Sequence, residues 1–461
     1  MKKYIQHIIL VSIDTLRADC INASPRAKEY LNKYKTKISL KTDSLDKILK
    51  SGLYFNNCFS AAPYTSASHA AYFTGMWPLK NGIYEFFNRR LIQSTIFQYA
   101  KEQSYTTIFQ TDFPVILGQA LGFTSGVDHY FIENEDKAFQ TLVKNSQANT
   151  LSFFHFGGVH YPYGFHTLRF GGKDYINKVD SLEKKYHVAG KEKQKLDDIL
   201  TETFRNKKDT ELLLRYKYII FEKLYKQGLY NDLFDLYLEG INYFLEHRFK
   251  KFIFSVKNFV DQRNAVLFIF SDHGEEWDSY SEGHHNTLSD NVLRAPLIVY
   301  GRGFKPGIEE HLIRTIDLAP TIINLLPHPV KTNMDGFNLN ILKSNSTMSV
   351  DKANYAISQV YTSIATKKQI ADYQNMSVKK NKAVKPLKTY LSGEAIRTED
   401  KKYVVYYQKN GSIIRREMLG NVNKLKKILV NYNKLRIEKK NKLSHIELKI
   451  KNELRNLGYQ V

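Results

Sequence analysis

The sequence predicts an α/β protein built around a mainly parallel β-sheet. Continuous apolar runs, such as residues 6–13 and 265–270, have the length and composition of strands that are buried on both faces. Between these runs lie segments with helical apolar spacing, such as residues 43–52, whose pattern ends at a glycine. Repeated alternation of strands and helices is typical of a parallel sheet that is covered by helices.

Each predicted element follows from its own pattern. Residues 43–52 begin with Asp-Ser and place Leu45, Ile48 and Leu49 on one side, which predicts a helix. Residues 229–260 form a long amphipathic pattern, which predicts a helix that leads into the next strand. In chain order the predicted elements are a strand at 6–13, a helix at 43–52, a helix-to-strand step at 94–112, a strand at 151–158, a helix at 229–260, strands at 265–270 and 295–301, and a helix at 315–327.

Composition divides the chain into a main domain, residues 1–345, and a C-terminal subdomain, residues 346–461. Residues 180–228 are Lys-rich and polar with a helical pattern, and we interpret them as an insertion in the main domain. Residues 394–419 predict two short antiparallel strands around an Asn-Gly turn. Residues 422–458 predict a basic helix, which could pack on the domain, pair with a second copy or contact an anionic membrane.

Composition also narrows the function classes. The net charge of +22 favours acidic partners, and because no nucleic-acid-binding motif accompanies it, no nucleic acid is expected.

No apolar run approaches the roughly 20 residues of a membrane span. The N-terminal apolar run has no small-residue cleavage site after it, which favours a buried strand over a signal peptide and predicts a cytoplasmic protein, with membrane-peripheral docking left open. The two cysteines, Cys20 and Cys58, are too few for a disulfide framework or a thiolate zinc site.

Three potential cation ligands follow predicted strands. Asp14 directly follows the strand at 6–13, and Asp272 and His273 follow the strand at 265–270. Because ligands bind outside the carboxyl ends of parallel strands, these side chains are expected at one edge of the sheet. Two carboxylates and an imidazole can hold a divalent cation, although an ordinary helix-capping Asp-His pair would explain residues 272–273 alone.

Thr65 lies in the stretch PYTSASHAAYFTG, where a helical pattern begins. If the helix starts at Ser66, Thr65 is its N-cap and lies beside unpaired backbone amides and the positive end of the helix dipole. An anion there is stabilised without a basic side chain, and a metal would make the hydroxyl a better nucleophile. A plain Ser/Thr cap explains the same residues when they are taken alone.

Together these segments resemble the sulfatase branch of the alkaline phosphatase superfamily. The matching segments occur in the family's order, cover most of residues 5–345 and add a short C-terminal piece. They are HIILVSIDTLRAD, DSLDKILKSGLYFNNCFSAAPYTSASHAAYFTGMWPLKNGI, HFGGVHYPY, SDHGEEW…EGHHNTLSDNVLRAPLIVYG, IRTIDLAPTIINLL with MDGFNL, and EAIRTEDKKYVVY. The resemblance implies an alkaline-phosphatase-like catalytic domain over residues 1–345, followed by a small C-terminal antiparallel sheet and the basic helix.

The departures from the family pattern bear on the chemistry. Sulfatases of this type convert the Cys or Ser of a Cys-x-Pro-x-Arg pattern to formylglycine, but here the pattern reads Thr65-Ser66-Ala67-Ser68-His69. Threonine carries a β-methyl group and cannot yield the formylglycine aldehyde. A threonine nucleophile instead resembles lipoteichoic acid synthase and the phosphoethanolamine transferases, which attack a phosphodiester and hold one divalent ion.

That resemblance implies one ion, Mn²⁺ or Ca²⁺ with Zn²⁺ as a further alternative, held by Asp14, Thr65, Asp272 and His273, and no formylglycine. No convincing second set of Asp and His ligands is found after the strand at 151–158.

Three histidines have family-implied roles. His160, in VHYPY, and His284, in EGHHNTL, match positions that contact the transferred group or its leaving oxygen, and His285 is an adjacent rival to His284. His69, one helical turn after Thr65, matches the family's arginine and could orient the anion.

The sequence therefore predicts a metal-dependent hydrolase or transferase that acts on phosphate esters, phosphodiesters in particular, through a phosphothreonine intermediate at Thr65. Two alternatives remain open: a sulfatase that does not use formylglycine, and a catalytically silent member that binds an anionic glycan. The expected partner is an anionic phosphate- or sulfate-ester substrate, with a glycan-linked ester as one form and with membrane docking or self-association through the basic helix left open.

Overall fold

The central sheet of the protein has eight strands, and all but one of them run in the same direction. The computed structural model describes residues 4–85, 90–114, 116–164, 173–191, 207–301, 304–340, 355–364 and 388–434. The strand order is β10-β2-β9-β6-β1-β5-β3-β4, and only β9 is antiparallel to its neighbours. The strands are β1 (His7–Ile13), β2 (Leu53–Phe59), β3 (Thr106–Thr111), β4 (His129–Ile132), β5 (Thr150–Phe156), β6 (Ala265–Phe270), β9 (Leu297–Gly301) and β10 (Gly307–Arg314).

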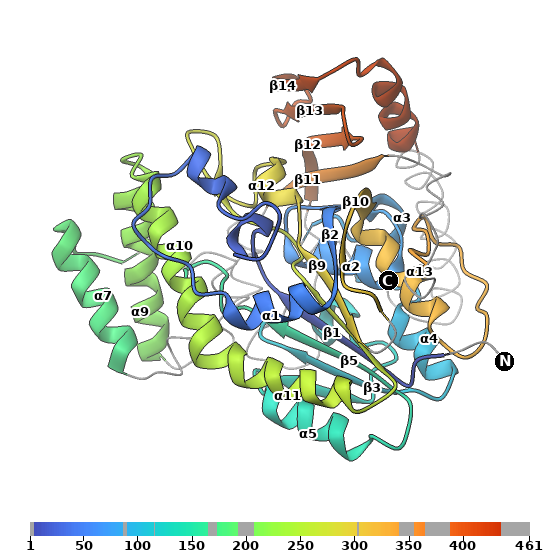
Figure 1. Cartoon of the computed structure of the whole chain (residues 1–461). Coiled ribbons are helices and arrows are strands. Elements are labelled where there is room, and N and C mark those ends of the chain that lie inside the picture. The colour runs from blue at the N-terminus through green and yellow to red at the C-terminus, as the bar shows by residue number, and fades with distance from the viewer. Residues whose placement is uncertain are drawn as a thin grey trace, which may run out of the picture.

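Helices cover both faces of this sheet (Figure 1). Alternate side chains of a strand point to opposite faces of the sheet, so each face needs a covering layer. In strand β1, Ile8 and Leu10 belong to one apolar cluster, and Ile9 and Val11 belong to the other. One face packs against α2 (Thr65–Thr74), α4 (Ile96–Glu102) and α13 (Leu318–Asn324), and the other against α1 (Asp43–Ser51), α5 (Glu135–Lys144) and α11 (Lys250–Asp261). The predicted mainly parallel α/β architecture is therefore confirmed.

The predicted long helix at 229–260 is continuous but not uniform. It consists of α10 (Tyr230–Phe244), the π-helical segment η6 (Leu245–Phe249) and α11. Upstream, the described part of the Lys-rich segment is mainly helical, with α7 (Lys173–Tyr186), α9 (Lys207–Tyr218) and a second π-helical segment, η5 (Ile219–Tyr225), while residues 187–191 are irregular. The rest of the predicted insertion, residues 192–206, lies outside the described residues.

The C-terminal sheet has four antiparallel strands where the sequence predicted two. Strands β13 (Lys402–Tyr407) and β14 (Ile413–Leu419) are the predicted hairpin, and β12 (Lys388–Arg397) and β11 (Ala356–Ile364) extend it. Strand β11 was missed because it lies in a polar stretch with no strong apolar alternation. The boundary between the two predicted domains stays a prediction.

Strand β11 also contacts the loop that precedes α2. Ser358 Oγ donates to the Ser60 carbonyl oxygen at 2.6 Å, and the Gln359 amide donates to the Ala61 carbonyl oxygen at 3.1 Å. The Tyr361 amide donates to Tyr64 Oη at 3.0 Å. The first strand of the C-terminal sheet thus fixes the chain just before Thr65.

The described part of the C-terminal basic helix, residues 423–434, packs on the protein. Leu425, Leu429 and Tyr432 are buried in a cluster with Trp77 and Ile316, and Tyr432 Oη accepts a hydrogen bond from the Leu79 amide. Residues 435–458 of the predicted helix lie outside the described residues. Among the described helices, none is long and apolar enough to cross a membrane.

Candidate metal centre and active site

The three predicted cation ligands meet at the carboxyl edge of the sheet. Strands β1 and β6 are parallel neighbours, so Asp14, which follows β1, faces Asp272 and His273, which follow β6. His273 Nε2 lies 3.4 Å from Asp272 Oδ2 and 4.0 Å from Asp14 Oδ1. All three side chains are fully buried, and one ligand atom from each lies within 4.8 Å of the others. The geometry therefore brings together the set that the sequence predicted.

The remaining contacts of these residues leave one atom of each unpaired. Asp272 Oδ1 accepts hydrogen bonds from the Thr15 and His273 amides, and His273 Nδ1 donates to the Gly274 carbonyl oxygen at 3.0 Å. Asp14 Oδ1, Asp272 Oδ2 and His273 Nε2 are buried and have no hydrogen-bond partner. Buried carboxylate oxygens without a donor are costly, and two carboxylates with an imidazole are ordinary ligands of a divalent cation, so the residues fit one.

The electrostatics of the two carboxyl groups indicate the same need for positive charge. Burial and the neighbouring charge of Asp272 hold the pKa of Asp14 well above its usual range. Burial opposes ionisation of Asp272 as well, but His273, His69 and His155 together hold the pKa of Asp272 below its usual range. Like-charged carboxyl groups at this distance cannot both ionise freely without a counter-charge.

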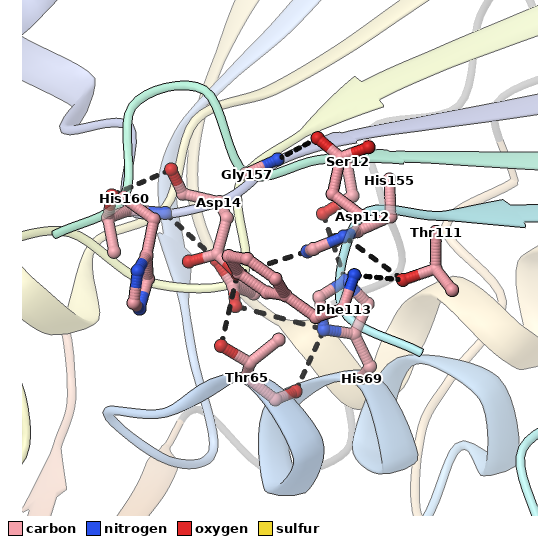
Figure 2. A network of polar contacts seen from close by, with 12 residues as sticks. Ser12, Asp14, Thr65, His69, Thr111, Asp112, Phe113, His155, Gly157 and His160 are labelled. Carbon is pink, nitrogen blue, oxygen red and sulfur yellow. Dashed lines mark hydrogen bonds and ion pairs between the residues drawn. The ribbon is translucent and has the colours of Figure 1, made fainter. Parts of the chain in front are cut away.

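Thr65 lies directly beside this cluster. Its Oγ1 donates a hydrogen bond to Asp14 Oδ2 at 3.1 Å, and the side chain is buried (Figure 2). The predicted N-cap position is wrong by one residue: Thr65 is the first helical residue of α2, and Tyr64 occupies the N-cap in an extended conformation. The hydroxyl still lies in the first turn, where backbone amides are unpaired and the helix dipole is positive.

His69 lies one turn further along α2, and both of its ring nitrogens are already engaged. Nδ1 donates to the Thr65 carbonyl oxygen at 2.8 Å, and Nε2 accepts from Ser12 Oγ at 2.9 Å. Burial among aromatic rings lowers the pKa of His69 to about 3, so the ring is neutral at physiological pH. This geometry does not support the expected direct contact of His69 with an anion, because no ring nitrogen is left to make one.

The two remaining predicted histidines lie next to the carboxylate cluster. The rings of His284 and His273 are 4.5 Å apart between centroids, and those of His284 and His160 are 5.3 Å apart. His284 Nδ1 is 2.7 Å from Glu275 Oε1, and its buried Nε2 has no hydrogen-bond partner. Burial holds the pKa of His284 well below its usual range and lowers the pKa of His160 to about 3.

His160 is fixed by a local contact, since its Nδ1 donates to the Tyr161 carbonyl oxygen at 2.7 Å. His285, which the sequence offered as the alternative to His284, is exposed, although its ring centroid is only 3.9 Å from that of His284.

Sequence reasoning missed a second group of polar residues beside the cluster. His155, the sixth residue of β5, has its Nε2 3.0 Å from Asp14 Oδ2 and its Nδ1 3.3 Å from Thr111 Oγ1 (Figure 2). Asp112 follows β3 and accepts a hydrogen bond from the Gly157 amide at 2.8 Å. The strand-end rule that selected Asp14 could also have selected Asp112, because β3, β5 and β1 are neighbours in the sheet.

Both carboxylate oxygens of Asp112 are already paired with an arginine. Arg248, from the π-helical segment η6, forms two hydrogen bonds to Asp112, at 2.7 and 2.9 Å, and two to Glu135, at 2.6 and 2.7 Å. The guanidinium also lies 5.0 Å from the centroid of the Phe156 ring. No sequence signal links Arg248 to the site, since it lies well outside the matched motifs.

The same architecture occurs in solved structures of other proteins. The chain resembles BT4656, solved in complex with its substrate D-glucosamine-2-N,6-O-disulfate, with a TM-score of 0.62 at 16% identity, covering 95% of this chain and 99% of that one. The phosphonate monoester hydrolase SpPMH from Silicibacter pomeroyi has a TM-score of 0.57 at 14% identity and 95% coverage of both chains. That of Agrobacterium radiobacter has a TM-score of 0.54 at 12% identity and 96% coverage of both. At these identities the likeness shows the fold.

The fold, the edge-of-sheet site and a match to a family model together define a hydrolase of the alkaline phosphatase superfamily. The family model named Sulfatase matches residues 6–328, well over half of the chain. The protein therefore belongs to the sulfatase family. No protein with a curated description matches the chain.

Proposed function

We propose that this sulfatase-family hydrolase acts on phosphate esters, phosphodiesters in particular, with Thr65 as its nucleophile. The observation that carries the proposal is the position of the Thr65 hydroxyl, which donates to Asp14 Oδ2 at 3.1 Å in the first turn of α2. Three potential ligand atoms without hydrogen-bond partners lie in the adjoining cluster. Because threonine cannot form the formylglycine aldehyde, direct attack by its hydroxyl oxygen is the chemistry open to this residue.

In the proposed step, Thr65 Oγ1 forms a bond to phosphorus in line with the leaving alcohol. The hydroxyl proton passes to Asp14 Oδ2, the bond from phosphorus to the leaving oxygen breaks, and threonine then carries the phosphoryl ester. The unpaired amides in the first turn of α2 can donate to the equatorial phosphate oxygens.

The cation site supports this chemistry. A divalent ion bound by Asp14, Asp272 and His273 would supply positive charge that offsets the charge of the phosphate group and favours loss of the Thr65 hydroxyl proton. Mn²⁺, Ca²⁺ and Zn²⁺ are the ions to test. His155, bonded to Asp14, and His69, bonded to the Thr65 carbonyl, act as positioning residues for the carboxylate and the nucleophile.

The leaving alkoxide needs a proton, and His284 can provide it from Nε2. Burial holds the pKa of Glu275 well above its usual range, so a protonated Glu275 donates to Nδ1 and leaves the ring proton of His284 on Nε2. His284 presents a buried Nε2 without a partner, and Glu275 holds the other ring nitrogen in place. The His160 ring lies 5.3 Å from the His284 ring, measured between centroids. Water that then attacks the phosphothreonine makes the protein a hydrolase, whereas an acceptor hydroxyl makes it a transferase.

The proposal is tested with the full chain on chromogenic phosphodiester, phosphomonoester and sulfate ester substrates, with each metal or with chelator. Thr65→Ala is expected to lower kcat/KM for the diester by at least about 10³-fold, the scale for loss of a nucleophile. Intact-mass measurement of the wild type during turnover is expected to detect a phosphoryl ester on Thr65. Ser66→Ala is the matched control, because the Ser66 hydroxyl is equally buried and has no partner. Loss of activity in Ser66→Ala with full activity in Thr65→Ala would reject the assignment.

A second candidate is hydrolysis of sulfate esters without formylglycine. The family membership favours it, as does the sulfated substrate bound to the structural neighbour BT4656. The same assay separates the two, since sulfate turnover that exceeds diester turnover and depends on Thr65 would replace the phosphate ester proposal.

A further inference from the structure

The outer edge of the C-terminal sheet is formed by strand β14. The strand order is β11-β12-β13-β14, so β14 pairs with β13 on one side and with no other strand in the described part of the chain. In Figure 1 the other three strands lie between β14 and the central sheet. The outward backbone amides and carbonyl groups of such an edge can pair with another strand. This edge is therefore a surface where a second β-strand can add to the sheet.

Strand β14 exposes apolar side chains at both of its ends. Four of its seven residues are apolar, and each of them is between 43% and 63% exposed. They are Ile413, Ile414, Met418 and Leu419. Because alternate residues of a strand point to opposite faces, each face of the sheet carries two of these side chains at its edge. A strand that pairs with this edge would cover apolar surface on both faces.

The middle of the strand is charged, with Arg415, Arg416 and Glu417 in succession. Arg415 and Glu417 lie on the same face, where Arg415 Nη2 is 3.1 Å from Glu417 Oε1, and their side chains are 31% and 37% exposed. The Arg415 guanidinium also lies 4.5 Å from the ring centroid of Tyr406 and 4.7 Å from that of Tyr280. These contacts hold the two charged groups in fixed positions, so an added strand meets one positive and one negative group.

The order of residues in β14 makes the strand complementary to itself. Its sequence is Ile-Ile-Arg-Arg-Glu-Met-Leu, and we consider two copies paired in antiparallel fashion with Arg416 on the two-fold axis. The directly opposite pairs are then Ile413–Leu419, Ile414–Met418 and Arg415–Glu417. Each pair occurs twice, so every apolar residue meets an apolar residue and the Arg415 and Glu417 charges alternate in sign. Such opposite pairs stabilise two adjoining strands.

Neighbouring registers lack this match. Each side chain keeps its face across the two-fold axis, so the axis must pass through a residue of the strand. Centring the pair on Arg415 sets Ile413 opposite Glu417. It also sets Ile414 opposite Arg416. Centring the pair one residue after Arg416 sets the two arginines opposite the apolar residues. The register centred on Arg416 avoids these mismatches, and its one cost is the pair of like charges at the axis.

We infer that β14 is the contact between two copies of this chain, which joins two four-stranded C-terminal sheets into one sheet of eight strands. A second copy is the partner because it supplies the matching residue at every opposite position. One strand per copy makes a small interface, so the expected Kd of the dimer is about 1–100 µM.

Sedimentation equilibrium of the full chain over a concentration series measures this Kd. The buffer contains salt, which screens the repulsion between two chains of net charge +22. Arg415→Glu sets like charges opposite each other, and so does Glu417→Arg, so each variant alone is expected to raise the Kd at least about tenfold. An equimolar mixture of the two variants restores both opposite-charge pairs in a heterodimer. The mixture is therefore expected to associate at least about tenfold more tightly than either variant, a rescue that two misfolded variants would not produce.

Two further variants separate this contact from a general effect of charge. Lys251→Glu, at an exposed position of α11 in the main domain, makes the same change in net charge as Arg415→Glu and is expected to leave the Kd unchanged. Arg416→Thr removes the like charges at the axis and is expected to lower the Kd about threefold. The inference is overturned if the wild type stays monomeric throughout the series, if Arg415→Glu and Glu417→Arg dimerise like the wild type, or if their mixture associates no better than its components.

Discussion

Two buried acidic clusters lie at the same edge of the sheet, and their charges are balanced in opposite ways. Asp112 and Glu135 share Arg248, which makes four hydrogen bonds to the two carboxylates. Among the described residues, no Lys or Arg forms an ion pair with Asp14 or Asp272, whose neighbours are histidines. The first cluster is complete within the chain, whereas the second keeps unpaired atoms.

The difference indicates where an external cation is required. The clusters are electrostatically connected, because the charge of Asp112 contributes to the raised pKa of Asp14. Arg248 balances Asp112 and so leaves the Asp14 cluster as the part of this edge that needs added positive charge. One internal cation and one bound cation would then serve two neighbouring sites, and the number of bound ions stays a prediction.

The largest expected effect comes from breaking the complete cluster. Arg248→Met leaves Asp112 buried without its partner, so we expect the free energy of unfolding to fall by about 3–5 kcal/mol. Denaturant unfolding monitored by circular dichroism measures the change. The double variant Arg248→Met/Asp112→Asn should recover much of the loss, and a similar loss in both variants would mean that packing of Arg248, and not charge balance, matters.

Breaking the incomplete cluster should affect activity more than folding. Asp272→Asn keeps the acceptor for the Thr15 and His273 amides but removes a charged ligand atom. We expect kcat/KM to fall by about 10²–10³-fold, as for loss of one strong electrostatic contact in a transition state. Metal content and turnover with added Mn²⁺ are the measurements, and unchanged metal binding would remove Asp272 from the ligand set.

The metal-free protein offers a sharper comparison. Asp14→Asn removes the repulsion between two buried carboxyl groups, so the metal-free variant should be more stable than the metal-free wild type, by about 1.4 kcal/mol for each pKa unit relieved. Added Mn²⁺ should then stabilise the wild type and not the variant. Thermal melts with chelator and with Mn²⁺ give both results, and a destabilised metal-free variant would contradict the reading of Asp14 as an unbalanced charge.

The smallest expected effect is at the rim of the complete cluster. Glu135→Gln leaves the Arg248–Asp112 pair intact, and the Glu135 side chain is 14% exposed. We expect a loss of stability of about 1 kcal/mol or less and unchanged turnover. Denaturant unfolding and the diester assay check this, and a loss comparable to that of Arg248→Met would show that Glu135 and not Asp112 is the main partner.

The sequence was most informative where a residue's position follows from local rules. Asp14, Asp272 and His273 were predictable because each lies within three residues of the end of a buried strand, and parallel strands end at one edge. Arg248 could not be predicted, because a π-helical segment far from the motifs directs it to Asp112. Strand β11 was missed because its residues lack a clear alternation.

His69 shows a different limit of sequence reasoning, and its role at the site stays a prediction. Its spacing from Thr65 correctly placed it on the same side of α2, but spacing does not reveal that Ser12 and the Thr65 carbonyl already engage its ring. Competition between nearby partners for one side chain is decided in three dimensions. The sequence therefore located the residue but not its contacts.

The bonds between β11 and the loop before Thr65 have a consequence for synthesis of the chain. Ser358 and Ser60, which share one of these bonds, are 298 positions apart. A ribosome must therefore deliver residues 355–364 before the loop at 60–64 acquires these partners, although α2 was translated long before. Nascent chains halted short of this strand should lack a fixed position for Thr65, so the enzyme would become competent only after residues 355–364 have been translated.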